Sequence, residues 1–310
     1  MLLIVSPNLA LDRILEVPNF RLAGVQRSTQ TTSQPGGKGI NVARVFRELG
    51  GQVVLTGLVG RDSSKWISES LKAREIQFDG VEAFENTRIC TIILDHSSKN
   101  HPTVINEESV EVDSHAAELL LNVVDKWMPQ ASAVFATGSL STGMSRDFYR
   151  YLLERARSVG KFTALDTTGP ALIEGVQARP GFLKLNAPEF AQFSGVSSPR
   201  TESVIDFLRK RGAELAHHTA ITFGEVGAIL HVNGQFWQAA PPQVFTANPI
   251  GAGDAFAAAY LHEFLASGDA ERSFRCALAA GASDANSIRP GDVNASEIRV
   301  LEKEVHIEQL

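Results

Sequence analysis

Short apolar runs alternate along the chain with longer segments in which apolar residues recur every three or four positions. A short apolar run predicts a buried strand, and the longer period predicts a helix with one buried face. The predicted strands span residues 2–5, 53–59, 133–136, 162–165, 182–185 and 220–223. The clearest helical stripes lie within residues 42–49, 120–127 and 148–155. This alternation predicts an α/β fold, with a mostly parallel central sheet flanked by helices.

Two local signals add detail to this pattern. The apolar run at residues 227–232 is followed by Asn233 and Gly234, a pair that favours a tight primed turn and therefore predicts a hairpin. Gly160 follows the third helical stripe and is predicted to end that helix.

Two segments, residues 11–34 and 85–111, fit the alternation less well. They are richer in polar residues and in Thr, Val and Ile, and we expect them to form a small accessory β-sheet. Open α/β sheets bind ligands beyond the carboxyl ends of their strands, so extra strands there could cover the site as a lid. We find no internal repeat or long linker. The expected organisation is a single domain, residues 1–310, with this lid.

Composition narrows the class of protein. The chain has 310 residues, of which 44% are hydrophobic and 21% charged, with a net charge of −6. Charges of both signs are interspersed, which argues against a nucleic-acid surface or a basic membrane-binding face. Cys90 and Cys276 are far apart and predict neither a disulfide nor a zinc site. Residues 1–7 lack the signature of a signal peptide, and no run of about 18 apolar residues occurs. We expect a soluble, cytoplasmic protein.

The most informative motif is the glycine-rich segment 248–254, which leads directly into a helical apolar pattern. Gly251 and Gly253 allow a tight turn, after which the free N–H groups of the first helical turn form an anion-binding site. Asp254 has two interpretations. It either caps the helix, or it accepts a proton from a hydroxyl that attacks a phosphoryl group bound at the turn.

A second glycine-rich turn, residues 35–41, precedes the helical stripe that starts at Val42. It differs from the P-loop because Lys38 is followed by Gly39 rather than by Ser or Thr, and it lacks the dinucleotide fingerprint. It predicts a second helix start that could also bind an anion.

Together the two glycine motifs resemble the signatures of the PfkB, or ribokinase-like, family of carbohydrate kinases. The resemblance covers essentially the whole chain, because further motifs of the family occur in order between them. These are Thr87-Arg88, Thr103-Val104-Ile105-Asn106-Glu107, Gly138-Ser139-Leu140, Leu165-Asp166-Thr167, Lys184-Leu185-Asn186-Ala187-Pro188-Glu189 and Thr222-Phe223-Gly224. The resemblance implies a ribokinase-like fold, ATP as phosphoryl donor and Mg²⁺. It also implies a homodimer that pairs through the lid.

The resemblance assigns roles on the sugar side of the site. Asp254 is similar to the family's general base, and the N–H groups of Gly251, Ala252 and Gly253 would stabilise the developing charge. The residues similar to the family's sugar contacts are Asp12, Gly37, Lys38, Asn41 and Ser139. Pro7-Asn8-Leu9-Ala10-Leu11-Asp12, Arg27 and Thr87-Arg88 resemble the branch that acts on sugars already carrying a phosphate. Arg27 and Arg88 are the candidates for binding that phosphate, because guanidinium groups match phosphate oxygens.

The resemblance also assigns the nucleotide side. The residues similar to nucleotide contacts are Lys184, Asn186, Thr222, Gly224, Ala279 and Ser283. Asn186 and Glu189 stand at the spacing of the family's Asn-x-x-Glu motif, which organises Mg²⁺, here expected to act through water. The same spacing also fits a helix cap. Asp284 departs from the pattern, because small or apolar residues usually occupy this stretch.

Two clues to the substrate disagree. Asn248-Pro249 is reminiscent of tagatose-6-phosphate kinases, whereas Ile105-Asn106-Glu107 is reminiscent of 1-phosphofructokinases. The second clue lies on the predicted lid next to the sugar, so we favour fructose 1-phosphate as the acceptor. The alternatives are tagatose 6-phosphate and fructose 6-phosphate, an unphosphorylated sugar or nucleoside, and a non-catalytic regulator that binds a sugar or nucleotide.

Overall fold

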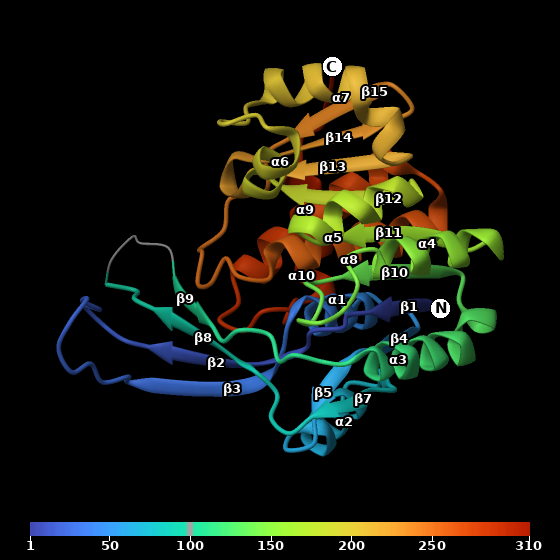
Figure 1. Ribbon diagram of the computed structural model, residues 1–310. Helices are drawn as coiled ribbons and strands as arrows, with labels where there is room; N and C mark the ends of the chain where they lie inside the picture. The colour runs from blue at the N-terminus through green and yellow to red at the C-terminus, as the bar shows by residue number, and fades with distance from the viewer. Residues whose placement is uncertain (98–101) are drawn as a thin grey trace.

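The structure, a computed structural model, describes residues 1–97 and 102–310, and its largest element is a central β-sheet (Figure 1). The described strands of this sheet follow the order β16-β15-β14-β13-β12-β11-β10-β1-β4-β6. They are β1 (Leu2–Val5), β4 (Val53–Thr56), β6 (Gln77–Phe78), β10 (Ala133–Thr137), β11 (Phe162–Asp166), β12 (Phe182–Asn186), β13 (His218–Thr222), β14 (Ala228–Val232), β15 (Gln235–Ala239) and β16 (Glu308–Gln309). Pairing is parallel from β6 to β13 and antiparallel beyond β13. The predicted α/β class is confirmed.

Helices cover both faces of this sheet, as Figure 1 shows. The face towards the viewer carries α3 (Ser114–Trp127), α4 (Phe148–Ser158), α5 (Gly169–Gly175), α6 (Ala187–Ser194) and α7 (Thr201–Leu215). The other face carries α1 (Lys38–Glu48), α8 (Ala252–Ser267), α9 (Ala270–Ala285) and α10 (Ala295–Leu301). Side chains of β1 alternate between the two apolar cores, Leu2 and Ile4 in one and Leu3 and Val5 in the other. Burial on both faces explains why the parallel strands are continuously apolar.

Several local predictions are also confirmed. Asn233 and Gly234 have φ values of 50° and 86° and join β14 to β15 in the expected hairpin. Gly160, with φ 75°, follows the end of α4. The remaining described helical elements are α2 (Ser64–Lys72) and the 3₁₀ turns η1 (Met128–Gln130), η2 (Val176–Ala178), η3 (Gly224–Val226) and η4 (Glu302–Glu304).

The predicted strand over residues 53–59 is wrong as a single element. The chain forms β4 and then β5 (Leu58–Gly60), which leaves the central sheet and pairs with β7 (Val81–Phe84). The Val81 N–H donates to the Gly57 carbonyl at 2.9 Å, where the new pairing starts. An apolar run does not reveal such a change of partner, because both halves are buried.

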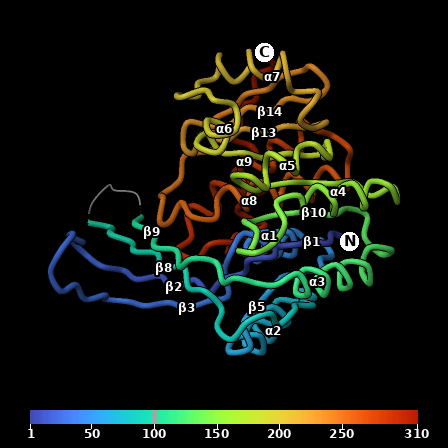
Figure 2. Tube along the Cα trace, viewed as in Figure 1, coloured from blue at the N-terminus to red at the C-terminus, as the bar shows by residue number. Residues whose placement is uncertain are grey.

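A second, four-stranded sheet projects from the body of the molecule (Figures 1 and 2). Its order is β3 (Gln30–Gly36), β2 (Ala10–Glu16), β8 (Ile89–Leu94), β9 (Thr103–Asn106). The two outer pairs are antiparallel, and β2 and β8 are parallel. The strands come from the two segments singled out in the sequence, 11–34 and 85–111, extended by Ala10, Pro35 and Gly36. Residues 98–101 of the second segment lie outside the described residues.

One face of this small sheet turns towards the start of α8. Ile14 and Ile92 lie on that face and pack, with Leu94, against Ile250 and Ile288. The space between the small sheet and the carboxyl ends of the central strands is therefore bordered by the turn before α8. Within residues 1–97 and 102–310, every helix is too short or too polar to cross a membrane.

Candidate active site

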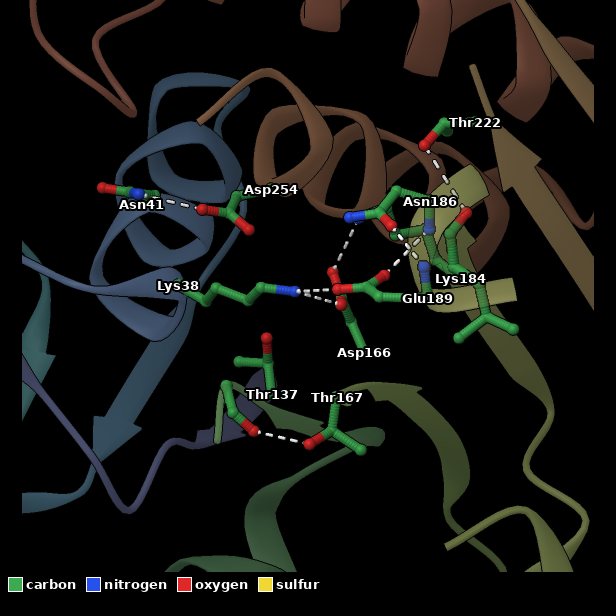
Figure 3. Close-up of polar contacts among 12 residues, drawn as sticks. Lys38, Asn41, Thr137, Asp166, Thr167, Lys184, Asn186, Glu189, Thr222 and Asp254 are labelled. Atoms are coloured by element: carbon green, nitrogen blue, oxygen red, sulfur yellow. Dashed lines mark hydrogen bonds and ion pairs between the residues drawn. The ribbon is translucent and has the colours of Figure 1, made fainter. Parts of the chain in front are cut away.

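Asp254 lies in the first turn of α8 and is 6% exposed. The Asn41 side chain, on α1, donates a hydrogen bond from Nδ2 to Asp254 Oδ2 at 2.9 Å (Figure 3). Burial raises the pKa of the Asp254 carboxyl to about 6, and the positive charge of Lys38 opposes this rise. Asp254 accepts no hydrogen bond typical of an N-cap, because Gly251 occupies that position. A buried, oriented carboxylate of raised pKa is suited to accepting a proton.

The turn before Asp254 brings the backbone close to a buried cation. Gly251 has φ 101°, in the left-handed region where a side chain is strained. A Cβ at Gly253 would lie 2.8 Å from Lys184 Nζ, so a larger residue here would displace this amine. The Ala252 N–H donates to the Pro249 carbonyl at 3.4 Å, whereas the N–H groups of Gly251 and Gly253 have no partner among the described residues. With the ammonium group of Lys184, these N–H groups suit a phosphate oxygen.

A charged cluster lies at the carboxyl ends of β11 and β12 (Figure 3). Asp166, which is fully buried, accepts from Lys38 Nζ at 2.6 Å and from Lys184 Nζ at 3.2 Å. The charges of these lysines outweigh burial and hold the pKa of Asp166 below its usual value. Burial lowers the pKa of Lys38, but Asp166, Glu189 and Asp254 raise it above its usual value overall. The cluster is therefore charged at neutral pH.

Asn186 and Glu189 form a complete capping box at the start of α6. Asn186 Oδ1 accepts from the Glu189 N–H, and Glu189 Oε2 accepts from the Asn186 N–H, both at 2.8 Å. The second oxygen, Glu189 Oε1, accepts from Lys38 at 3.3 Å. The capping interpretation of this motif is confirmed. Asn186 and Glu189 also lie beside the cluster around Asp166 (Figure 3).

Asp12 lies on β2, facing the turn that contains Gly36, and is 5% exposed. A Cβ at Gly36 would lie 2.1 Å from the Asp12 carboxyl, so the backbone here passes directly over that group. Burial raises the pKa of Asp12 to about 6, opposed by the charge of Arg44. The next residue, Gly37, is the N-cap of α1. Two carboxyl groups, Asp12 and Asp254, thus flank the start of α1.

Arg88 and Ser139 are joined through Asn8. The Arg88 guanidinium donates to the Asn8 carbonyl at 3.2 Å and to Cys90 Sγ at 3.3 Å. The Asn8 side chain donates to Ser139 Oγ at 2.9 Å. Arg88 Nε is buried and has no partner among the described residues. A cation with an unused donor beside a hydroxyl and an amide is suited to binding a phosphate group.

Arg27 lies apart from the other predicted substrate residues. It is exposed, in the loop between β2 and β3. Asp12 pairs with Gln34, whereas Glu16 pairs with Gln30 at the other end of the same two strands. This end lies four strand residues, or roughly 13 Å, from Asp12, and Arg27 is in the loop beyond it. Lys38, predicted to contact the sugar, donates hydrogen bonds to Asp166 and Glu189.

A cavity of about 380 Å³ adjoins the turn before α8. Its polar edge carries predicted nucleotide residues, namely Lys184, Asn186, Thr222 and Gly224. Its apolar wall includes Val244, Phe256, Leu278 and Ala282. This size and lining are those of a pocket for a heteroaromatic base with a polar tail.

Ala279 and Ser283, predicted to lie near the adenine, are not among the lining residues of this cavity. Helix α9 instead contributes Leu278, Gly281, Ala282 and Ala285, which follow the i, i+3, i+4, i+7 spacing of one helix face. Ala279 is fully buried in the core, and the Ser283 hydroxyl donates to Glu297 at 2.5 Å. The cavity is lined by the same helix as these two residues, and their role near the adenine stays a prediction.

The structure supplies an account of Asp284. Its side chain is fully buried behind the turn before α8, and Oδ1 accepts from the Gly291 N–H at 2.6 Å. A Cβ at Gly251 would lie 2.7 Å from Asp284 Oδ2. Burial holds the pKa of Asp284 well above its usual range, so the group is suited to a neutral, structural role. Asn248 is also buried and holds the backbone near this turn, because its Nδ2 donates to the Ile288 carbonyl at 2.9 Å.

Two polar residues of the site were not assigned a role from the sequence, namely Asp166 and Asn8. Asp166 is the last residue of β11, and Asn8 lies three residues beyond β1. Their position could have indicated a role, because polar residues at the carboxyl ends of parallel strands border the ligand site. What the sequence did not reveal is that Asp166 lies between two lysines from different elements.

This arrangement defines a phosphotransferase that acts on a small-molecule hydroxyl, because an anion-binding turn and an oriented carboxylate adjoin a nucleotide-sized cavity. The chain belongs to the pfkB family of carbohydrate kinases, whose model matches residues 3–289. The family match and the phosphofructokinase relatives together support ATP-dependent phosphosugar kinase activity on a ribokinase-like fold.

Three relatives illustrate the similarity. The chain is 30% identical to a 1-phosphofructokinase of Rhodobacter capsulatus, over 99% of this chain and 97% of the relative. It is 25% identical to a tagatose-6-phosphate kinase of Staphylococcus epidermidis, over 99% of both. The crystal structure of a possible 1-phosphofructokinase from Thermotoga maritima is 25% identical and superimposes with a TM-score of 0.89, covering 100% of this chain and 99% of that one.

Proposed function

We propose that the protein transfers the γ-phosphate of ATP to a hydroxyl of a ketohexose phosphate, with Asp254 as general base. The observation that carries this proposal is the position of Asp254. It directly follows Ala252 and Gly253, which line the nucleotide-sized cavity, and its carboxylate is oriented by Asn41 on α1, the helix whose start adjoins Asp12. The N–H groups of Gly251, Ala252 and Gly253, with Lys184, stabilise charge on the transferred group.

The acceptor sugar extends from Asp254 towards Arg88. Asp12, Gly37 and Asn41 bind its hydroxyls, and Arg88 with Ser139 binds the phosphate that it already carries. Arg27 is a further candidate for that phosphate, although in the single chain it lies beyond the far end of β2 and β3. Names of relatives include both 1-phosphofructokinase and tagatose-6-phosphate kinase. We propose fructose 1-phosphate as the preferred acceptor.

Mg²⁺ would bind at the site with water molecules between the ion and the protein side chains. The described residues contain no group of three acidic, histidine or cysteine side chains that could enclose a metal ion. Oxygens of Asn186 and Glu189 are already used in the capping box, so these residues would hold water ligands of an ion bound mainly by the phosphates. When bound, Mg²⁺ neutralises phosphate charge. The capping box orients Glu189 for this role.

We further propose that residues 1–310 act as one kinase domain in which the four-stranded sheet is the lid. Closure of β2, β3, β8 and β9 over the site would exclude water from the transferred phosphate. A homodimer pairing through this sheet would cover its outer face, and we expect the enzyme to act in the cytoplasm.

At acidic pH, the dependence of kcat/KM on pH should follow the ionisation of Asp254. The carboxylate must be ionised to accept a proton, and burial raises its pKa to about 6. We therefore expect kcat/KM to fall as the pH drops below about 6, approaching tenfold per pH unit. The phosphate of the substrate also titrates near pH 6. The kcat/KM of the wild type at each pH is therefore divided by that of Asp254→Asn, which removes the contribution of the substrate. A quotient that stays constant from pH 5 to 8 would contradict the assignment.

Arg88→Ala should raise KM for the phosphosugar by about 10- to 100-fold, because a charge-assisted phosphate contact contributes about 1.5–3 kcal/mol. KM for ATP should change less than about threefold, since Arg88 lies on the sugar side. Arg61→Ala, which removes an exposed arginine paired with Glu85, is the matched control. Equal increases in both KM values would argue against a phosphate contact.

The test of the proposed function is a substrate panel in which ADP release is measured with fructose 1-phosphate, fructose 6-phosphate, tagatose 6-phosphate, fructose and ribose. We expect the highest kcat/KM with fructose 1-phosphate. A higher value with tagatose 6-phosphate or fructose 6-phosphate would overturn the choice of sugar. Preference for a free sugar would overturn phosphate recognition, and binding without ADP release would identify a regulator.

A further inference from the structure

A row of side chains crosses all strands of the four-stranded sheet at one level. Asp12 on β2 pairs with Gln34 on β3 and with Cys90 on β8, and Cys90 pairs with Asn106 on β9. Directly paired residues of neighbouring strands share a face of the sheet. Gln34, Asp12, Cys90 and Asn106 therefore form a continuous row on one face.

This row lies on the face that borders the site. Asp12 is the buried carboxyl group beside the start of α1. Two residues further along the same strands, Ile14 and Ile92 pack against Ile250 of the turn before α8. Since side chains alternate with period two along a strand, Asn106 and Val104 on β9 share this face, whereas Ile105 points to the other.

The backbone around Asn106 is held firmly in register. Its neighbour Glu107 accepts a hydrogen bond from the Ile89 N–H to Oε2 at 2.8 Å, and the Glu107 N–H donates to the Ile89 carbonyl at 3.1 Å. The Asn106 side chain, in contrast, is exposed and makes no hydrogen bond within the described part of the chain. An amide with free donors and a free acceptor thus faces the site from a fixed strand.

Asn106 stands at the phosphate end of the site. It lies opposite Cys90, whose sulfur accepts from the Arg88 guanidinium. The chain after β9 then joins the segment that follows Ser139, because the Val112 N–H donates to the Thr142 carbonyl at 2.8 Å. Through Cys90, Asn106 is therefore a neighbour of Arg88, one of the two groups that we assign to the substrate phosphate.

Ketohexose 1-phosphates and 6-phosphates differ at the carbon next to the phosphate-bearing one. In the furanose ring of fructose 1-phosphate this carbon is the anomeric centre and carries a hydroxyl. In fructose 6-phosphate and tagatose 6-phosphate it carries only hydrogen, the ring oxygen and carbon. A hydrogen-bonding group beside the phosphate can therefore distinguish the two classes.

We propose that Asn106 hydrogen-bonds the anomeric hydroxyl next to the phosphate and thereby selects ketohexose 1-phosphates over 6-phosphates. The inference rests on the proposed function and adds a specificity residue to it. An amide can donate to this hydroxyl and accept from it, so either orientation of the hydroxyl is satisfied.

The test compares two substrates that differ only in this hydroxyl. They are fructose 1-phosphate and 2,5-anhydromannitol 1-phosphate, which has the same ring and phosphate but lacks the anomeric hydroxyl. The quantity measured is the ratio of their kcat/KM values in the wild type, Asn106→Ala and Ile105→Ala. We expect a ratio of about ten in the wild type, the effect of one neutral hydrogen bond, and about one in Asn106→Ala. Ile105→Ala, on the opposite face, should retain the wild-type ratio.

Each other outcome is distinct. A wild-type ratio near one, or a ratio unchanged in Asn106→Ala, overturns the inference, whereas efficient use of fructose 1-phosphate would still support the proposed function. Failure of the wild type to use fructose 1-phosphate overturns both the choice of sugar and the role of Asn106. Partial misfolding does not affect the comparison, because the active fraction cancels in the ratio.

Discussion

Asp254→Asn is expected to lower kcat by about 10²- to 10⁴-fold while leaving KM for both substrates nearly unchanged. The amide keeps the size of the side chain but has no basic oxygen that can take the proton of the attacking hydroxyl. The effect falls on kcat because the proton moves only in the transition state. Initial rates at saturating ATP and sugar phosphate measure it directly.

The control for this variant is Asp206→Asn, which neutralises an exposed carboxylate on α7 and should leave kcat at the wild-type value. The hydrogen bond from Asn41 helps to separate the loss of the base from a change in structure. An amide at position 254 can still accept from Asn41 Nδ2 through its oxygen, so the start of α8 keeps its geometry. A turnover number close to that of the wild type would remove Asp254 from the role of base.

Asp166→Asn is expected to cause the second large effect, on both stability and activity. The variant leaves Lys184, which is 3% exposed, without its buried counter-ion, and breaking such a pair costs about 3–5 kcal/mol of unfolding free energy. Lys38 keeps one partner, Glu189. With Lys184 no longer held behind Gly253, kcat should also fall. Calorimetry and steady-state kinetics measure the two effects.

The pH dependence of this loss has a definite sign. The pKa of Asp166 is lowered in the folded protein, so its stabilising contribution is present above the unfolded pKa and is lost as the pH falls through the folded value. The difference between wild type and variant should thus persist at neutral pH and shrink only in strong acid.

A double variant separates charge from packing. Asp166→Asn with Lys184→Met removes the unpaired cation and should be more stable than Asp166→Asn alone, yet remain weakly active. Wild-type stability in the single variant would contradict the proposed electrostatic cost.

Sequence predictions were accurate where the structure depends on residues close together in the chain, and failed where it depends on distant ones. The hairpin at Asn233 and the helix end at Gly160 depend on neighbouring residues, and both were predicted. The capping box of Asn186 and Glu189 is equally local, and its spacing was recognised. The continuous strand over residues 53–59 was wrong, because the exchange of partner after Gly57 depends on β7, more than twenty residues away.

The contacts within the site also join residues that are far apart in the sequence, and the sequence did not predict them. Ala279 and Ser283 lie on α9, whose residues Leu278, Gly281, Ala282 and Ala285 line the cavity, and the sequence could not tell which side of this helix faces it. The partner of Asp254, Asn41, is separated from it by 213 positions. The placement of Asp166 between Lys38 and Lys184 requires three elements to meet, and no local pattern specifies such a meeting.

The sequence by itself determined the α/β class, the two glycine-rich helix starts and the chemical character of the groups that follow them, because periodicity and turn chemistry act over a few residues. Only the tertiary structure decided which groups meet. The order and register of the strands bring Asp254 to Asn41, place Asp166 between two lysines, align Asn106 with Asp12, and leave Arg27 at the opposite end of its strand pair. These contacts depend on packing across the sheet, so residues far apart in the chain determine them together.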